Sequence, residues 1–281
     1  ITHKSISRHK GIITPGFVNS HCHIELSHLK EKFPKGTGLI PFIESVIKER
    51  GASDEEIERA MEQADQDMKA NGIVAVGDIV NKSLSRKVKR QSSIHYHTFV
   101  EILCFEPEKA QDLFREGLAL CEAFDKLPSS ITPHAPYSVC KEIFRFLKQL
   151  HNPEGNLLSI HNQESEEENK FYRYKSGGFI DFYNKLKRNI EFFKAQARDS
   201  IQTIVPLLPK KQPVMFVHNT YTNMKDIYFV DRFGGKVTWC LCPNANLYIE
   251  NRLPKIDIFL NQESPIVLGT DSLASNDKLC I

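Results

Sequence analysis

Histidine and acidic residues occur at the ends of several short apolar runs in this sequence. His21 and His23 are separated by one residue, so in an extended chain both imidazoles point to the same side. Similar side chains end later apolar runs; they are His134, His161, Glu164, His218 and Asp271. Imidazole nitrogens and carboxylate oxygens are ligands that suit zinc or iron. These residue types therefore point to a metal centre, and a position left open for water would make it catalytic.

Each of these residues has a simpler explanation when it is taken alone. A single histidine at a strand end, such as His218, is more often a hydrogen-bonded structural residue, and a His-x-His pair by itself decides nothing. Several separate runs, however, supply ligand-type residues in an order that one barrel could bring together. The whole set, and not any one member, predicts the metal centre.

Eight apolar runs would have to place these side chains at one end of the fold. They span residues 11–21, 73–80, 94–103, 129–136, 157–163, 214–220, 237–244 and 265–272. Helix-like stretches lie between most of them, which is typical of an α/β fold with a parallel sheet. Eight such units predict a TIM-like (β/α)₈ barrel, in which catalytic groups lie at the carboxyl ends of the strands.

The connecting helices are clearest in three places. Residues 53–71 have apolar side chains at helical spacing, a capping box of Ser53 and Glu56, and Gly72 as a stop signal. Residues 106–124 and 138–150 are also predicted to be helical. The connection 165–213 is unusually long, which favours an insertion or a lid. Its acidic run 166–168 is expected to be the solvated start of a helix.

The composition is that of an ordinary globular enzyme and excludes several classes of protein. The chain has 281 residues, and 37 basic against 35 acidic side chains give a net charge of +2. This balance predicts no nucleic-acid partner. No run approaches 18 apolar residues, so no membrane span or membrane partner is expected. Seven cysteines at irregular spacings favour free thiols in a reducing compartment, here the cytoplasm.

Six segments of the chain resemble motifs of the amidohydrolase superfamily. They read PGFVNSHCHIELS, HAPYS, SIHNQES, FVHNTY, CPNANLYI and LGTDSLASN, and they follow that family's order from Gly11 to Asn276. The nearest subgroup contains triazine hydrolases, chlorohydrolases and the cytosine, guanine and adenosine-type deaminases. The resemblance implies a metal-dependent hydrolase barrel over residues 11–281, incomplete at its C-terminus. Residues 1–10 would then be the remnant of an N-terminal β-sandwich that is mostly missing from this chain.

By this resemblance, four side chains bind one divalent metal per chain. The ligands are His21, His23, His161 and Asp271. Zinc is the expected metal, with iron as the alternative. No lysine ends a middle strand, so a dinuclear site built on a carboxylated lysine is not expected and the centre is taken as mononuclear.

The resemblance also implies catalytic roles. Asp271 accepts a proton from the metal-activated water, and Glu164 protonates a ring nitrogen and then the leaving amine. His218 hydrogen-bonds the water and stabilises the new C–O bond. His134 contacts the substrate.

Four more residues are candidates for contacts with the substrate. Glu25 lies on the same side of the chain as the paired histidines, although a supporting hydrogen bond would explain it equally well. Tyr137 lies in the HAPYS motif, and packing against the barrel wall is its alternative explanation. Glu101 lies near the end of its strand. Asn246 lies in a loop that would close over the substrate, and turn chemistry alone would also favour it.

Together these residues predict a metal-dependent aminohydrolase that deaminates a purine nucleoside-like or related N-heterocyclic small molecule. An acid placed to protonate an amine leaving group favours deamination over dehalogenation or ring opening. Among deaminases, the form HCHIELS and the long insertion resemble the aminodeoxyfutalosine deaminases. Guanine deaminase, methylthioadenosine or adenosylhomocysteine deaminase and chlorohydrolase activities remain alternatives, as does a non-catalytic ligand-binding barrel. A homodimer is compatible with the sequence.

Overall fold

The computed structural model describes residues 10–150 and 155–281, and this part of the chain contains eight strands paired in parallel. They form two sheets, in the orders β1-β2-β3-β4 and β5-β6-β7-β8. Each predicted apolar run overlaps one strand, so the predicted architecture is confirmed. The strands are β1 Phe17–Cys22, β2 Ile73–Val80, β3 His95–Ile102, β4 Ser129–Pro133, β5 Leu158–Asn162, β6 Val214–His218, β7 Val237–Leu241 and β8 Ile266–Leu268.

Hydrogen bonds join the two sheets at both seams and complete the (β/α)₈ barrel. Between β4 and β5, His161 N donates to His134 O at 2.9 Å. Between β8 and β1, Asp271 N donates to His21 O at 3.0 Å. These are the same residues that the sequence places at strand ends. Joining the two sheets therefore also brings the candidate site residues together.

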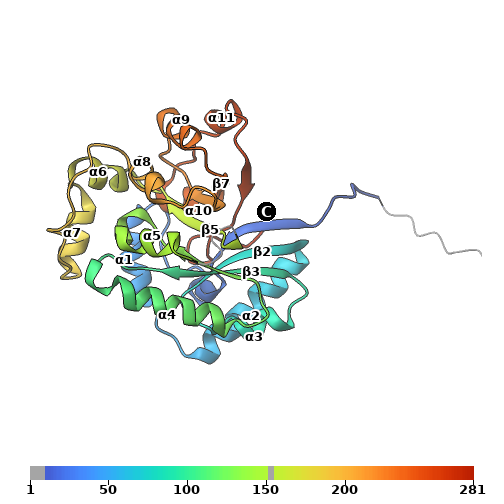
Figure 1. Cartoon of the computed structure of the whole chain (residues 1–281). Helices are drawn as coiled ribbons and strands as arrows, with labels where there is room; N and C mark the ends of the chain where they lie inside the picture. The colour runs from blue at the N-terminus through green and yellow to red at the C-terminus, as the bar shows by residue number, and fades with distance from the viewer. Residues whose placement is uncertain (1–9, 151–154) are drawn as a thin grey trace, which may run out of the picture.

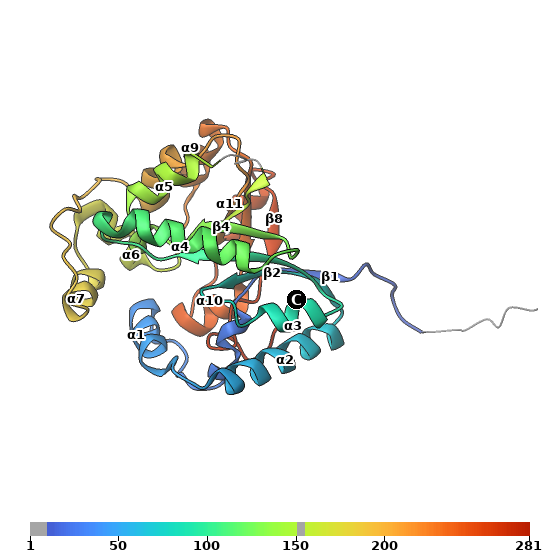
Figure 2. The ribbon, with the colours of Figure 1, turned by 60° about the horizontal axis from the view of Figure 1, so that its bottom comes forward.

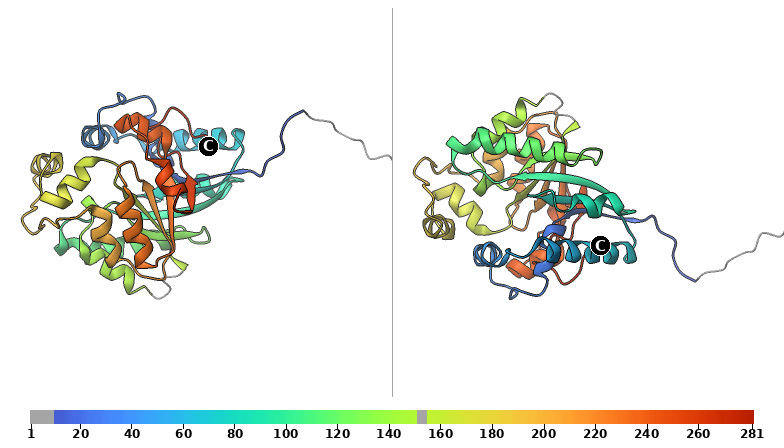
Figure 3. Two further views of the ribbon diagram at one scale, coloured as in Figure 1. Left: turned by 90° about the horizontal axis from the view of Figure 1, so that it is seen from above. Right: turned by 90° about the horizontal axis from the view of Figure 1, so that it is seen from below.

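Amphipathic helices cover the outside of the barrel (Figure 1, Figure 3). They are α2 Asp54–Ala70, α3 Arg86–Gln91, α4 Ala110–Ala123, α5 Lys141–Lys148, α9 Met224–Phe233 and α11 Ile256–Leu260. Ser53 Oγ accepts from Glu56 N at 3.2 Å at the start of α2, and Gly72 follows its end with a φ of +78°. The helix predicted at 53–71 is thus confirmed, and those predicted at 106–124 and 138–150 contain α4 and α5.

Further helices lie in the connections that leave the carboxyl ends of the strands. They are η1 Ile24–Leu29, α1 Leu39–Glu49, η2 Pro107–Lys109, η3 Pro136–Ser138, α6 Glu166–Tyr174, α7 Gly178–Lys185 and α10 Pro243–Glu250. Figure 2 shows α1 and α7 on the same side of the molecule. Lys185 Nζ lies 2.7 Å from Glu44 Oε1, and a side chain at Gly178 would collide with Ile40. These contacts hold α1 and α7 against each other.

The long connection between β5 and β6 is helical and rich in buried aromatic side chains. It contains α6, α7, α8 Ser200–Ile204 and η5 Val205–Leu207. Phe171 and Phe179 are fully buried, and they pack in one cluster with Tyr183, Tyr137 and Phe105. The connection is therefore packed onto the loops that follow β3 and β4, which fits the predicted insertion over the strand ends.

The acidic run of that connection departs from the sequence-based expectation. Ser165 caps α6 by accepting from Glu167 N at 3.3 Å, so a helix does begin at Glu166 as predicted. Glu168, however, is fully buried and accepts a hydrogen bond from Gln163 N at 3.1 Å. The expectation of a fully solvated run is therefore wrong at this position, because the third residue of α6 faces the barrel.

Two predictions concern the chain as a whole. The expected β-sandwich remnant, residues 1–10, lies outside the described residues except for Lys10 and stays a prediction. None of the helices in the described part of the chain combines the length and apolar character needed to cross a membrane.

Candidate metal centre and active site

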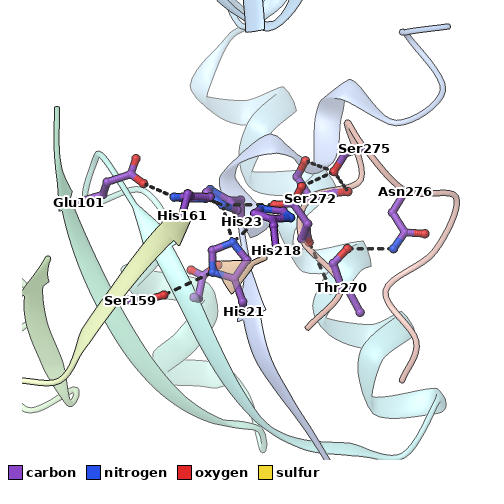
Figure 4. A network of polar contacts seen from close by, with 12 residues as sticks. His21, His23, Glu101, Ser159, His161, His218, Thr270, Ser272, Ser275 and Asn276 are labelled. Carbon is purple, nitrogen blue, oxygen red and sulfur yellow. Dashed lines mark hydrogen bonds and ion pairs between the residues drawn. The ribbon is translucent and has the colours of Figure 1, made fainter. Parts of the chain in front are cut away.

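The imidazoles of His21, His23 and His161 converge at the carboxyl ends of the strands (Figure 4), and the Asp271 carboxylate lies against them. His23 Nε2 lies 3.1 Å from His21 Nε2 and 3.2 Å from His161 Nε2. Asp271 Oδ1 lies 3.3 Å from His23 Nε2 and 3.6 Å from His21 Nε2. Ligand atoms at roughly 2.0–2.1 Å from a tetrahedral ion are about 3.3 Å apart. The four atoms therefore fit around one cation.

The three histidines are in the neutral form that metal ligands require. His161 Nδ1 lies 2.9 Å from His134 O, and because a carbonyl only accepts, Nδ1 carries the proton and Nε2 keeps its lone pair. Burial lowers the pKa of His21 and lowers the pKa of His23 to about 3. Burial also holds the pKa of His161 well below its usual value. Each imidazole can therefore offer a lone pair at neutral pH.

Asp271 follows β8 in a left-handed backbone conformation, with a φ of +59°. Its Oδ2 accepts from Ser275 Oγ at 2.5 Å, which leaves Oδ1 directed at the imidazoles. Burial opposes ionisation, but hydrogen bonding to His21 and the nearby His23 hold the pKa of Asp271 well below its usual value. The carboxylate is therefore charged, as a cation ligand must be.

A buried ion pair supports the segment that follows β1. Lys89 projects from α3 into the barrel wall, where its Nζ lies 2.6 Å from Asp78 Oδ2, and both side chains are completely buried. Asp78 Oδ1 accepts from Ile24 N at 2.9 Å, directly after His23. A lysine on an outer helix is thus linked through one carboxylate to the backbone beside a candidate ligand.

Glu164 and His218 lie beside the ligand cluster and face each other. Glu164 Oε1 is 3.7 Å from His218 Nε2, and both residues are buried. Burial raises the pKa of Glu164 well above its usual value. Asn246 Nδ2 donates to His218 O at 3.3 Å, so its Oδ1 is the atom that accepts from His218 Nδ1 at 2.9 Å. His218 therefore presents an unprotonated Nε2 to the site.

A second polar group lies on the β3 side of the ligands. Glu101 Oε1 lies 3.6 Å from His161 Nδ1 and 3.9 Å from His134 Nε2. Its Oε2 accepts from Asn81 Nδ2 at 3.1 Å, and Glu25 Oε2 accepts from Asn81 N at 3.1 Å. Burial raises the pKa of Glu101 to about 8 and that of Glu25 to about 7. Asn81 thus bridges two acids that are protonated more readily than usual.

Other groupings of possible ligands exist around the same point. Ligand atoms of His218 lie within 4.8 Å of those of His21, His161 and Asp271. Ligand atoms of Glu101, His134 and His161 also lie within 4.8 Å of one another. We keep His23 as the fourth ligand because its Nε2 lies 3.1 to 3.3 Å from the other three candidate ligand atoms, the spacing expected around one ion.

A cavity of about 360 Å³ opens from this cluster between α1 and α7. Its walls are largely apolar; they include Leu39, Phe42, Ile43, Val46, Ile47, Leu103, Phe105, Phe182, Tyr183 and Leu186. Its polar part includes His23, His134, His161, Glu164, His218 and Asp271. An apolar slot thus leads to a polar end that holds the candidate catalytic groups.

The predicted substrate contacts divide into two kinds. His134, Glu101 and Tyr137 line the cavity. Within the described parts of the chain, Glu25 and Asn246 are not among its lining residues. Glu25 accepts from Asn81 N and Asn246 accepts from His218 Nδ1, so both support residues that do line the cavity.

Sequence reasoning missed several residues that hold the site together. Asp78 is a charged residue in an otherwise apolar strand, and that contrast could have identified it. Lys89 carried no such signal, because three other basic residues occupy the same short helix. Gln163, adjacent to Glu164 in the SIHNQES motif, is fully buried and makes several hydrogen bonds.

Comparisons with known proteins agree with this geometry. Residues 12–281 match the model of the Amidohydrolase family. The chain is 26% identical to an adenosine deaminase of Helicobacter pylori, over 96% of this chain and 66% of that protein. It is 25% identical to an aminodeoxyfutalosine deaminase of Nitratiruptor sp., over 95% of this chain and 65% of that protein. The chain therefore spans just under two thirds of the length of these relatives.

Among solved structures, the chain is similar to the crystal structure of Helicobacter pylori aminofutalosine deaminase in complex with methylthio-coformycin. The TM-score is 0.82 at 24% sequence identity, and the match covers 94% of this chain and 65% of that chain. At this identity the likeness supports the fold, and the chemistry has to be argued from the site.

Proposed function

Because the chain belongs to the amidohydrolase family, as its motifs predicted, we propose that it is a metal-dependent aminohydrolase acting on a purine nucleoside-like substrate. The observation that carries this proposal is the convergence of four ligand atoms beside Glu164 and His218 at the polar end of one cavity. The relatives named adenosine deaminase and aminodeoxyfutalosine deaminase support the same class of reaction.

The metal we propose is one zinc ion per chain, with iron as the alternative. His21, His23, His161 and Asp271 would hold it. Three imidazole nitrogens and one carboxylate oxygen suit zinc, and the reacting water would take a fifth position beside these four ligands. When bound, such a cation lowers the pKa of water from about 15.7 towards roughly 7, which supplies the nucleophile.

Glu164 supplies the proton in the proposed reaction. Burial raises the pKa of its carboxyl well above the usual value, so at neutral pH it can donate to a ring nitrogen and make the adjacent carbon electrophilic. The water oxygen then bonds to that carbon, and Asp271 accepts the proton that the water loses. Glu164 then takes the proton of the new hydroxyl group and passes it to the exocyclic amine, so the carbonyl forms, the C–N bond breaks and ammonia leaves.

His218 and His134 orient the reacting groups. Because His218 Nδ1–H donates to Asn246 Oδ1, the Nε2 lone pair can accept a hydrogen bond from the attacking water. His134 Nδ1 is likewise held by Ser138 Oγ at 2.6 Å, which leaves its Nε2 facing the cavity near Glu101. His134 and Glu101 are the proposed contacts to the substrate ring and its substituents, together with Tyr137.

The cavity walls favour a substrate with flat and apolar parts. Aliphatic side chains from α1 face aromatic side chains from α7 across the slot, and such walls suit the faces of a planar ring. An adenine nucleoside, including aminodeoxyfutalosine, fits this description. Guanine and a halogenated triazine are the alternative substrates.

The remaining proposals concern the cellular compartment, the binding partner and the oligomeric state. All seven cysteines are free in the structure, which supports a reducing compartment such as the cytoplasm. The proposed partner is a small molecule, and a homodimer stays a prediction.

Ammonia release from a panel of compounds tests the proposed function. Zinc-loaded protein would be incubated with adenosine, methylthioadenosine, aminodeoxyfutalosine, guanine and a chlorinated triazine. We expect ammonia from at least one adenine nucleoside, loss of that activity on chelation, and recovery with zinc. Ammonia from guanine alone would favour a guanine deaminase, and chloride from the triazine would favour a chlorohydrolase. No product from any compound, with metal bound, would favour a non-catalytic barrel.

A further inference from the structure

The orientation of Glu164 depends on its backbone and not on partners of its side chain. Within the described residues its carboxylate has no hydrogen bond, and its ion-pair contact with His218 is long, at 3.7 Å. The preceding residue, Gln163, has a φ of +45°, a left-handed conformation that residues other than glycine seldom adopt. This turn at the end of β5 directs Glu164 into the cavity.

Gln163 is fully buried, and its backbone is bonded on both sides. Its N–H donates to Glu168 Oε1 of α6 at 3.1 Å. Its carbonyl accepts from Tyr221 N, in the loop after β6, at 2.9 Å. Two elements far apart in sequence therefore hold the turn in place.

The side-chain amide of Gln163 is engaged as well. Its Nε2 donates to Asn169 Oδ1 at 3.1 Å and to Asp226 Oδ2 at 3.0 Å. Its Oε1 accepts from Thr222 Oγ1 at 2.6 Å. Both amide protons and the carbonyl oxygen thus have partners, so a single rotamer satisfies the whole group.

The partners of this amide are themselves fixed. Asp226 belongs to the capping box of α9 with Asn223, and its Oδ1 accepts from Gln202 Nε2 of α8 at 2.6 Å. Asn169 lies on α6, directly after Glu168. One glutamine therefore ties the end of β5 to α6, the β6 loop and α9.

We propose that Gln163 is a positioning residue for Glu164, an inference that rests on the proposed function. A left-handed conformation in a residue other than glycine persists only where its surroundings hold it. Without the amide bonds, the turn would relax and Glu164 would lose its approach to the substrate ring. The four candidate ligands keep their own supports, so metal binding would remain.

Substitution of Gln163 by a side chain of equal length tests this inference. Gln163→Met keeps the length but can make none of the hydrogen bonds of the side-chain amide. Gln212→Met is the matched control, because Gln212 is also buried and donates to Asn156 O at 2.6 Å, before β6 and away from the site. Both variants lose a buried side-chain amide, but of the two substituted residues only Gln163 is next to Glu164.

We expect a specific kinetic signature from zinc-loaded protein. For Gln163→Met, kcat should fall by about tenfold or more while KM stays within about twofold and metal content equals that of the wild type. For Gln212→Met, kcat should stay within about twofold of the wild type. Gln163→Asn keeps an amide and tolerates the left-handed turn, so its kcat should be intermediate. If Gln163→Met fails to fold, Gln163→Asn carries the test, with a kcat below that of the wild type and an unchanged KM.

Crystal structures of the zinc-loaded wild type and variants separate this inference from the proposed function. If the wild type releases no ammonia, the proposed function fails, and the inference is judged on the position of Glu164 alone. We expect the Glu164 carboxylate of Gln163→Met to leave its place beside His218 while the four candidate ligands stay unchanged. A wild-type kcat in Gln163→Met, or an unmoved Glu164, would overturn the inference.

Discussion

The sheet β1–β4 and the sheet β5–β8 support their site residues by different means. In β1–β4 the support is a buried ion pair. Lys89 pairs with Asp78, and Asp78 accepts from Ile24 N beside the first candidate ligands. In β5–β8 uncharged amides give the support, because Gln163 bonds the side chains around the turn before the proposed acid and Asn246 orients His218, a candidate catalytic residue.

The backbone differs between the two sheets in the same way. Gln163, His218 and Asp271 have φ values of +45°, +73° and +59°. Among the described residues, no candidate site residue that follows β1, β3 or β4 has a positive φ. Such conformations cost roughly 1–3 kcal/mol each and persist only where the surroundings hold them. We therefore expect that substitutions of the supporting residues in β1–β4 lower the free energy of unfolding, whereas those in β5–β8 lower kcat.

Breaking the ion pair of the first sheet should have the largest effect. Lys89→Met leaves Asp78 as an unpaired buried acid, so we expect the free energy of unfolding to fall by about 3–5 kcal/mol. Lys87→Met is the control, since Lys87 is exposed and pairs with Glu58 at 2.6 Å. An exposed pair contributes less than about 1 kcal/mol. Urea denaturation measures both variants, and equal losses would contradict the role given to Lys89.

Removal of the proposed proton donor tests whether the second sheet carries the groups that determine kcat. Glu164→Gln should retain its metal and lose at least about 100-fold in kcat, or about 2.7 kcal/mol of barrier lowering. Glu166→Gln, two residues later on α6, should keep the wild-type rate, because its partner is the surface residue Arg173. Steady-state kinetics with metal analysis measures both. Near-normal turnover in Glu164→Gln would remove this residue from the mechanism.

Loss of the Ser275 hydroxyl should weaken metal binding without preventing it. Ser275 Oγ donates to Asp271 Oδ2 at 2.5 Å, and loss of a hydrogen bond to a ligand typically lowers metal affinity by about 10–100-fold. A chelator competition titration of Ser275→Ala measures this change. Ser45→Ala is the control, because its hydroxyl donates to Pro41 O of its own helix, away from the candidate ligands. The same zinc affinity in both variants would show that Ser275 does not support the ligand.

The smallest expected effect is a pH dependence at Glu168. Burial raises its pKa from 4.5 to about 8, so between these values the folded protein holds a proton that the unfolded chain has released. Stability therefore falls as the pH rises through this window. The side chain of Glu168→Gln does not titrate, so the variant lacks this pH-dependent loss of stability. The free energy of unfolding of the variant, relative to that of the wild type, should therefore increase by at most about 1.4 kcal/mol from pH 6 to pH 7. A difference that urea denaturation finds to be independent of pH would contradict the buried position of the acid.

Much of the fold could be predicted because it depends on local patterns. Strand runs, helix caps and the position of polar residues at strand ends are properties of short segments, and they located all eight strands and the converging histidines. Helix α1 was missed, although Leu39, Phe42, Ile43 and Val46 follow helical spacing. Those apolar side chains line a cavity, and the sequence alone does not distinguish such a wall from a packed core.

The supports of the site could not be predicted because they join distant segments. Asp78 acquires its role from Lys89 on a following helix and from Ile24 at the start of η1. Gln163 acquires its role from residues up to 63 positions away, and a glutamine in a loop motif gives no sign of burial. Glu168 was expected in solvent because acidic runs usually are, and only the packing of α6 against β5 reverses that expectation.

Anomalous diffraction from crystals grown with zinc would test the central claim most directly. Data on both sides of the zinc absorption edge locate every bound ion without reference to activity. We predict one strong peak per chain, within bonding distance of His21, His23, His161 and Asp271. An ion bound elsewhere, or no ion at saturating zinc, would contradict the assignment of these side chains as one metal centre.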